Sequence, residues 1–138
     1  MTKFIIDAGA LLHLAGEEFD GPGDHELLAP TLIRSQVLSR LHESVHRGEL
    51  SEAVATARLA HIARIPMRLL GDAVLRRVAW KLATELGWAS TYDAEYLALT
   101  QLQGDAFITL DDELARRAEK VVTLASIDEL IATGRASS

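Results

Sequence analysis

Short apolar runs alternate with longer amphipathic stretches throughout this sequence, and this alternation constrains the fold more than any other feature. The runs typical of buried strands are Phe4–Ile6, Leu27–Ala29, Ala106–Ile108 and Val121–Leu124, with a further extended segment at 66–70. Strands buried on both faces of a parallel sheet are continuously apolar, and parallel neighbours need helical connections between them. The pattern therefore predicts an α/β protein, a three-layer α/β/α sandwich around a central, mainly parallel sheet.

Helical periodicity fills the segments between these runs. Apolar residues recurring at three and four positions predict helices over 8–14, 30–48, 51–65, 72–86, 92–102 and 112–119. Pro30 is expected in the first turn of the second of these helices, and Gly87 is expected to end the fourth. Ser126 and Glu129 have the Ser-x-x-Glu spacing of a capping box, which predicts a terminal helix.

Composition and length favour a single globular domain over residues 1–138. About half of the residues are apolar (49%) and there is no cysteine, which excludes disulfides and thiolate metal sites. No apolar stretch approaches the roughly 20 residues that a membrane-spanning helix needs. The first 12 residues have the pattern of a strand and a helix rather than of a signal peptide. We therefore expect a cytoplasmic protein without a membrane partner.

Charge is unevenly distributed along the chain, although the formal net charge is only −6. Residues 1–30 carry one base and six acids, residues 31–90 nine bases and five acids, and residues 91–138 four bases and nine acids. An acidic pocket beside a basic helical surface would suit a metal-dependent enzyme that acts on a polyanion. Charged helix faces in contact with solvent explain the same distribution without any function.

Four oxygen-bearing side chains occupy the positions where an α/β sheet gathers its chemistry. Asp7 follows the first strand, Asp111 follows the strand at 106–108, Asp93 lies in the first turn of its helix, and Gln36 lies in the second turn of the helix after Pro30. In a parallel sheet such positions meet at the carboxyl edge. Neighbouring carboxylates stay ionised near neutral pH when a cation lies among them, and oxygen-only ligands suit Mg²⁺ or Mn²⁺.

Each of these residues also has a purely structural explanation. Asp93 lies three residues after Ser90 and can complete a capping box, while Asp111 and Asp7 can each cap the helix that follows. Gln36 can be an ordinary surface residue of its helix. Capping alone does not explain why three helices should present acids at the same sheet edge, which is why we favour the metal site.

The sequence resembles the PIN-domain ribonucleases, and in particular the VapC-type toxins of prokaryotic toxin–antitoxin pairs. The resemblance rests on five segments in order, namely 4–12, 29–41, 47–51, 92–99 and 108–114, with the Tyr-Asp-Ala-x-Tyr-x-Ala-Leu and Thr-x-Asp-x-x-Leu elements the most specific. It implies an α/β/α sandwich that cleaves RNA with Mg²⁺ or Mn²⁺. It also implies a small antitoxin partner, whose basic side chain can enter the acidic pocket, and a homodimer.

The resemblance also assigns roles to individual residues. Asp7, Asp93 and Asp111 would be metal ligands, and the Thr109 hydroxyl would orient a carboxylate or a metal-bound water. Asp112 would be an acid in the outer shell of the site.

The main departure from the family is Gln36, where a glutamate is usual. An amide oxygen can still ligate but brings no negative charge, so metal affinity should be lower. The chain is then an enzyme with a weaker site, a natural pseudo-enzyme that only binds RNA or an antitoxin, or the product of a disabling Glu→Gln change. Gly9 is a lesser departure, because many relatives have a polar side chain at this position.

Other enzyme classes fit the sequence less well. His42-Glu43-Ser44-Val45-His46 matches the zinc motif His-Glu-x-x-His, for which the third ligand would have to come from His61, Asp72 or Glu85. A haloacid-dehalogenase-like phosphatase needs a second aspartate two residues after the first, where this chain has glycine. A receiver domain needs an acidic pair after the first strand and a late lysine after a strand, and neither is evident here.

Overall fold

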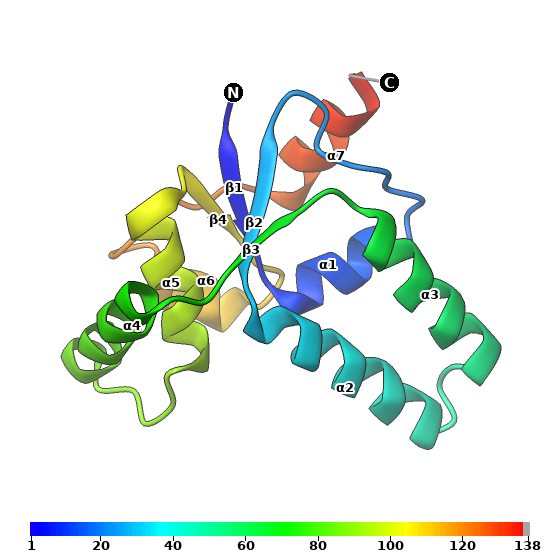
Figure 1. Cartoon of the computed structure of the whole chain (residues 1–138), viewed down its shortest axis with the longest axis horizontal. Coiled ribbons are helices and arrows are strands. Elements are labelled where there is room, and N and C mark those ends of the chain that lie inside the picture. Colours follow the sequence, from blue (N-terminus) through cyan, green and yellow to red (C-terminus); the bar gives the residue numbers. More distant parts are fainter. Residues whose placement is uncertain (137–138) are drawn as a thin grey trace.

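A four-stranded sheet, parallel throughout, forms the centre of the structure, a computed structural model that describes residues 1–136 and the side chains through residue 132 (Figure 1). The strand order is β3-β2-β1-β4. The strands are β1 (Lys3–Ile6), β2 (Glu26–Pro30), β3 (Arg68–Leu70) and β4 (Ala106–Ile108). The helices are α1 (Ala8–Ala15), α2 (Leu32–His46), α3 (Glu52–Arg64), α4 (Ala73–Leu86), α5 (Tyr92–Gln103), α6 (Asp112–Ala118) and α7 (Ile127–Ala136).

Helices flank the sheet, as predicted for an α/β protein. Figure 1 shows α1, α2 and α3 together beside one face, where they pack against one another, and α4 and α5 on the other side. α5 lies directly against β1, β2 and β4, and α4 packs along the outside of α5. None of the helices in the described chain is long and apolar enough to cross a bilayer.

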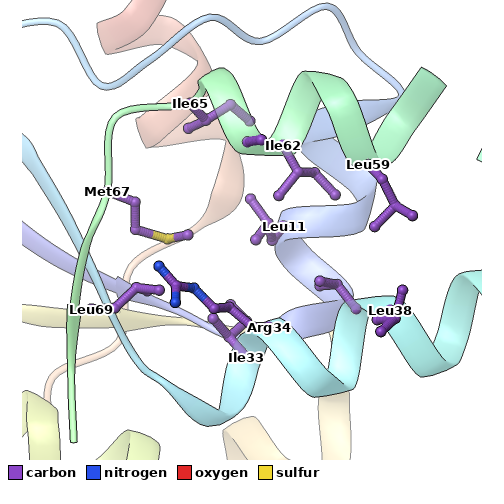
Figure 2. Close-up of a pocket in the computed structure, with 11 residues that line it drawn as sticks. Leu11, Ile33, Arg34, Leu38, Leu59, Ile62, Ile65, Met67 and Leu69 are labelled. Carbon is purple, nitrogen blue, oxygen red and sulfur yellow. The ribbon is translucent and has the colours of Figure 1, made fainter. Parts of the chain in front are cut away.

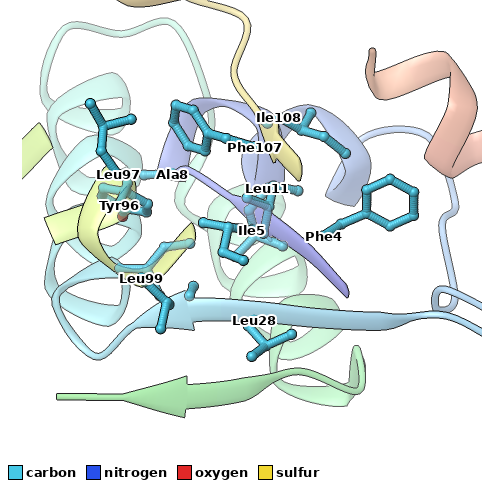
Figure 3. Packing of buried hydrophobic residues seen from close by; sticks show 14 of the residues in the cluster. Phe4, Ile5, Ala8, Leu11, Leu28, Tyr96, Leu97, Leu99, Phe107 and Ile108 are labelled. Atoms are coloured by element: carbon cyan, nitrogen blue, oxygen red, sulfur yellow. The ribbon is translucent and has the colours of Figure 1, made fainter. Parts of the chain in front are cut away.

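The core lies between the sheet and its inner helices (Figure 3). Ile5 and Ile6 of the central strand have no exposed surface, and the same is true of Phe107 in β4. Tyr96 and Leu97 of α5 are the large side chains that cover this part of the sheet from the α5 side. Burying several residues of this size, at about 1.5–3 kcal/mol each, provides the main driving force for folding.

Helix ends agree closely with the capping signals in the sequence. The Ser51 hydroxyl accepts from the Val54 amide at 3.1 Å. Gly87 ends α4 in the left-handed region with φ of 72°, where glycine meets no steric penalty. The predicted capping box is present, because the Ser126 amide donates to Glu129 Oε2 at 2.6 Å and the Glu129 amide donates to Ser126 Oγ at 3.3 Å.

One predicted helix start and one predicted strand are wrong. Pro30 ends β2 instead of beginning a helix, and α2 starts at Leu32. A proline fits the end of a strand because its carbonyl can still accept a hydrogen bond, although it has no N–H group to donate one. The segment Val121–Leu124 is not a strand. The Val121 and Val122 amides donate to the Ala118 carbonyl and close the end of α6, so that Leu124 forms only an isolated parallel bridge with Phe107.

Gly104 lies where α5 approaches β1, and it provides a test of this packing. A Cβ at position 104 would overlap the Ile5 Cδ1 atom and lie 3.3 Å from the Thr100 Cα, although the backbone itself, with φ of −108°, is open to any residue. Gly104→Ala is therefore expected to lower the free energy of unfolding by about 1–3 kcal/mol, the usual effect of overpacking. Urea denaturation measures this loss.

Gly16→Ala is the matched control for that experiment. A Cβ at position 16 would have its nearest neighbour, the His13 carbonyl oxygen, at 3.5 Å, which is an ordinary contact. Its φ of −82° suits alanine, so stability should be unchanged or slightly higher. Equal stability of both variants would contradict the tight approach of α5 to β1.

Candidate active site

Asp7 is the first residue beyond β1, and both of its carboxylate oxygens are fixed. Oδ1 accepts from the Ala10 amide at 3.0 Å and so caps α1, while Oδ2 accepts from the Thr109 hydroxyl at 2.5 Å. The second contact joins residues 102 positions apart in sequence. It exists because β1 pairs with β4 in parallel, with Ile6 opposite Ile108, so that the next residues of both strands emerge together at the carboxyl edge.

Thr109 connects Asp7 to Asp111. Its hydroxyl oxygen also accepts from the Asp111 amide at 3.1 Å. Asp111 Oδ1 in turn accepts from the amides of Glu113 and Leu114, at 3.0 and 3.1 Å, and caps α6. Asp7 and Asp111 thus both act as helix caps. Asp111 Oδ2 accepts no hydrogen bond from any residue that the structure describes.

Asp93 does not cap its helix. Within residues 1–136 its carboxylate accepts no hydrogen bond, and the Ser90 hydroxyl accepts from the Tyr92 amide at 3.2 Å instead. The N-cap residue, Thr91, makes no side-chain cap. The side chain of Asp93 is exposed in the first turn of α5 and is free to rotate.

Gln36 belongs to this edge through a hydrogen bond with α5. The Tyr96 hydroxyl donates to Gln36 Oε1 at 2.6 Å, which joins residues 60 positions apart. Burial raises the pKa of the Tyr96 phenol, and the nearby charge of Asp7 adds to the effect, so the hydroxyl keeps the proton that it donates. Gln36 is accordingly held in place, half-buried, as a neutral acceptor.

The carboxyls of this edge influence one another. Burial raises the pKa of Asp7, against the lowering effect of its hydrogen bonds with Thr109 and Ala10, and Asp93 contributes a smaller increase. Desolvation also raises the pKa of Asp93, and the charge of Asp111 adds to it. Asp93 therefore lies within electrostatic reach of Asp7 and of Asp111, and Thr109 links these last two residues through its hydrogen bonds.

Two arginines partly balance this negative charge. Arg40, one turn after Gln36 on α2, lowers the pKa of both Asp7 and Asp93, and Arg117 of α6 lowers that of Asp93. Arg40 reaches over the first turn of α1, where a Cβ at Gly9 would lie only 3.1 Å from Arg40 Nη1. The absence of a side chain at Gly9 therefore gives Arg40 its space beside Asp7.

The residues at this edge suit a hard divalent cation in their donor chemistry. All of the donors are oxygens, and three of them belong to carboxylates. Over the described residues, however, no three acidic or histidine side chains are gathered closely enough to hold an ion. Among the three aspartates, Asp93 is the one whose carboxylate accepts no hydrogen bond from the described residues.

The remaining sequence candidates lie elsewhere. Asp112 is exposed at the first residue of α6. In the zinc motif, His42 is exposed and His46 is the last residue of α2. His61, a possible third zinc ligand, has both ring nitrogens against backbone carbonyls, those of Ala15 at 3.1 Å and Phe19 at 2.6 Å. It therefore connects α3 to the loop after α1.

Sequence reasoning missed two residues of this edge, Tyr96 and Arg40. Helical spacing offered a signal for both, because Tyr96 follows Asp93 by three positions and Arg40 follows Gln36 by four, which places each pair on one helix face. The partners themselves could not be read from the sequence, because the contact between Tyr96 and Gln36 depends on how α5 and α2 meet across the end of the sheet.

No protein-family model and no curated protein matches the sequence, but solved structures match the fold. PAE2754 from Pyrobaculum aerophilum is similar over 98% of both chains, with 21% identity and a TM-score of 0.75. A chain of VapBC2 from Rickettsia felis, solved bound to a DNA fragment from its promoter, is similar over 90% of this chain and 98% of its own, with 9% identity and a TM-score of 0.66. At such identities the likeness shows the fold alone, an α/β fold with helices flanking a parallel sheet.

The raised pKa of Asp7 predicts how stability depends on pH in metal-free buffer. The folded protein binds a proton at Asp7 more tightly than the unfolded chain, whose carboxyl has the ordinary value of 3.8. The ionised carboxyl therefore destabilises the fold, and this effect grows as the pH rises above 3.8 through the raised value. Asp7→Asn, which keeps a good helix cap, should gain stability relative to the parent over this range.

Urea denaturation from pH 4 to pH 7 in the presence of EDTA measures this difference. Asp20→Asn, at an exposed acid in the loop after α1, is the control and should show no such trend. A constant difference between Asp7→Asn and the parent across the range would contradict the burial of an ionisable Asp7.

Proposed function

We propose that this chain is a divalent-metal-dependent endoribonuclease of the PIN type and the toxin component of a toxin–antitoxin pair. The observation that carries the proposal is that Asp7, Asp93 and Asp111 come from three separate helix starts of a PIN-like fold, with Asp7 and Asp111 joined through Thr109 and with Asp93 within electrostatic reach of both. Helix capping explains the positions of Asp7 and Asp111. It does not explain Asp93, which caps no helix and lies near the other two negative charges.

The residues of this edge fit phosphodiester hydrolysis. Asp7, Asp93 and Asp111 would hold Mg²⁺ or Mn²⁺, which when bound activates a water and offsets charge on the phosphate. Thr109 donates to Asp7 and so keeps that carboxylate in one orientation. Arg40 brings a positive charge to the same edge, where an approaching phosphate needs one. Water attacks phosphorus directly, so no covalent intermediate with the protein is required.

The partners follow from the same proposal. The similarity to a chain of the VapBC2 structure supports an antitoxin partner, and the acidic edge would accept a basic side chain from it. We also propose that the chain forms a homodimer in the cytoplasm. RNA is the proposed substrate, in keeping with the basic middle third of the sequence.

A second function is favoured by one observation, the neutral amide of Gln36. Gln36 accepts a hydrogen bond from the Tyr96 hydroxyl and brings no charge to the proposed metal site. The fold would then serve as a catalytically impaired module that binds RNA or an antitoxin. Titration calorimetry separates the two functions, because the module would bind no Mn²⁺ at millimolar concentration while still binding its partner.

RNA cleavage tests the first function directly. We expect cleavage of single-stranded RNA with Mg²⁺ or Mn²⁺, none with EDTA, and a loss of at least about a hundredfold in rate for Asp7→Asn, as is typical when a group that stabilises the reacting charges is removed. Asp20→Asn, exposed and remote, should retain the parent rate. Cleavage that survives both EDTA and Asp7→Asn would contradict a metal-dependent site.

Gln36→Glu tests whether residue 36 limits the metal site. A carboxylate here would still accept from the Tyr96 hydroxyl and would add a negative charge near the cation. At the effective dielectric of a protein surface this charge is worth on the order of a few kcal/mol, so Mn²⁺ affinity should rise at least about tenfold. Titration calorimetry measures the affinity, with Gln103→Glu at the far end of α5 as the charge control. Equal gains in both variants would exclude a specific role for residue 36.

A further inference from the structure

The outward face of α4 carries a tryptophan that the fold does not use. Trp80 is 72% exposed, whereas the opposite face of α4 packs Leu75, Ala79 and Leu82 into the core. Packing within the described chain does not account for the position of this indole. A single exposed apolar side chain is common on protein surfaces, so the residues around Trp80 decide whether this is a contact surface.

Basic side chains surround this tryptophan. Trp80 lines a shallow hollow of about 500 Å³ together with Ala73, Arg76 and Arg77, which share one helix face at spacings of three and four residues. Lys81 follows directly and reaches Glu85 only at 4.0 Å. We call Arg76, Arg77, Trp80 and Lys81 the α4 platform.

One arginine of the α4 platform is preorganised. Arg76 Nη1 donates to the Gly71 carbonyl at 3.1 Å, which holds the guanidinium against the start of the helix. Burial raises the pKa of Glu95 in α5 and the charge of the same guanidinium partly offsets this increase, so Arg76 lies within electrostatic reach of α5. Arg77 forms no ion pair with any residue of the described chain, so its charge is available to a ligand.

Charge decides which kind of partner suits this surface. In a twofold dimer that used α4 as its interface, the α4 platform of one copy would face the α4 platform of the other. The clustered positive charges around the two tryptophans would then repel one another. A single-stranded nucleic acid matches the platform in both respects, because an unpaired base stacks on an aromatic ring and the adjoining phosphates pair with arginine and lysine. A duplex would offer phosphates but no free base face.

We propose that the α4 platform binds single-stranded RNA, with an unpaired base stacked on Trp80 and the neighbouring phosphates held by Arg76, Arg77 and Lys81. This proposal rests on the proposed ribonuclease function for the identity of the nucleic acid. It adds a binding surface outside the acidic edge, on a different helix, that acts before cleavage and does not need a metal.

Fluorescence anisotropy of a labelled single-stranded oligoribonucleotide, titrated in EDTA so that no metal-dependent cleavage occurs, tests the platform. Trp80→Ala should weaken binding about tenfold or more, the usual effect of removing one stacking partner, and Trp80→Phe should retain most of the affinity. Arg77→Glu should weaken binding and lower the salt dependence by about one phosphate contact. Arg64→Glu, an exposed arginine on α3 across the sheet, is the control for charge and should bind like the parent.

Three results would overturn the platform. The first is an affinity of Trp80→Ala within twofold of the parent, with its thermal midpoint unchanged. The second is equal binding of duplex and single-stranded RNA. The third is sedimentation showing that Trp80→Ala dissociates a dimer without any change in RNA affinity, which would assign this face to a second copy of the chain.

The same series separates this proposal from the proposed function. RNA binding that depends on Trp80, without any cleavage when Mn²⁺ is added, would remove the nuclease function and leave the platform. Cleavage that depends on Asp7 but not on Trp80 would keep the nuclease function and remove the platform.

Discussion

The parallel pairing of β1 with β4 is the constraint on which the candidate site depends. Ile6 lies opposite Ile108 in this register, and the Asp7 amide continues the ladder by donating to the Ile108 carbonyl at 3.4 Å. The first residues beyond each strand, Asp7 and Thr109, therefore meet and form a hydrogen bond. β1 is buried from Phe4 to Ile6 and β4 over its whole length, so the energy that fixes this register comes from core packing that has no part in the chemistry.

The charge balance at this edge explains why residue 36 matters. Burial raises the pKa of Asp7 and of Asp93, and Arg40 and Arg117 offset part of the negative charge. Gln36 adds no charge, and its hydrogen bond with Tyr96 holds it in place as a neutral group. A divalent cation would complete the balance, whereas without one the ionised, half-buried Asp7 destabilises the fold. Carboxyls with such shifted pKa values are typical of functional sites, where local stability is given up for chemistry.

Much of the architecture could be predicted from the sequence because it follows from local rules. Buried strands, amphipathic helices and the capping box at Ser126 each depend on residues within a few positions of one another. Pro30 was misjudged because β2 continues through it and pairs with β3, and Val121–Leu124 was misjudged because the Val121 and Val122 amides close the end of α6. The acids were singled out because Asp7 and Asp111 follow strands and Asp93 begins a helix. Helical spacing gave a signal for Tyr96 and Arg40, but their contacts could not be predicted, because packing across the sheet sets how α2, α5 and α1 meet.

The position of a bound ion is the most direct test of a metal site at this edge. Crystals of the protein soaked with Mn²⁺, with diffraction recorded at the manganese absorption edge, report the position of the metal without reference to activity. We expect an anomalous peak within about 2.5 Å of carboxylate oxygens of Asp7, Asp93 and Asp111. A saturating soak that gives no peak at this edge, or a peak at His42 and His46 instead, would contradict it.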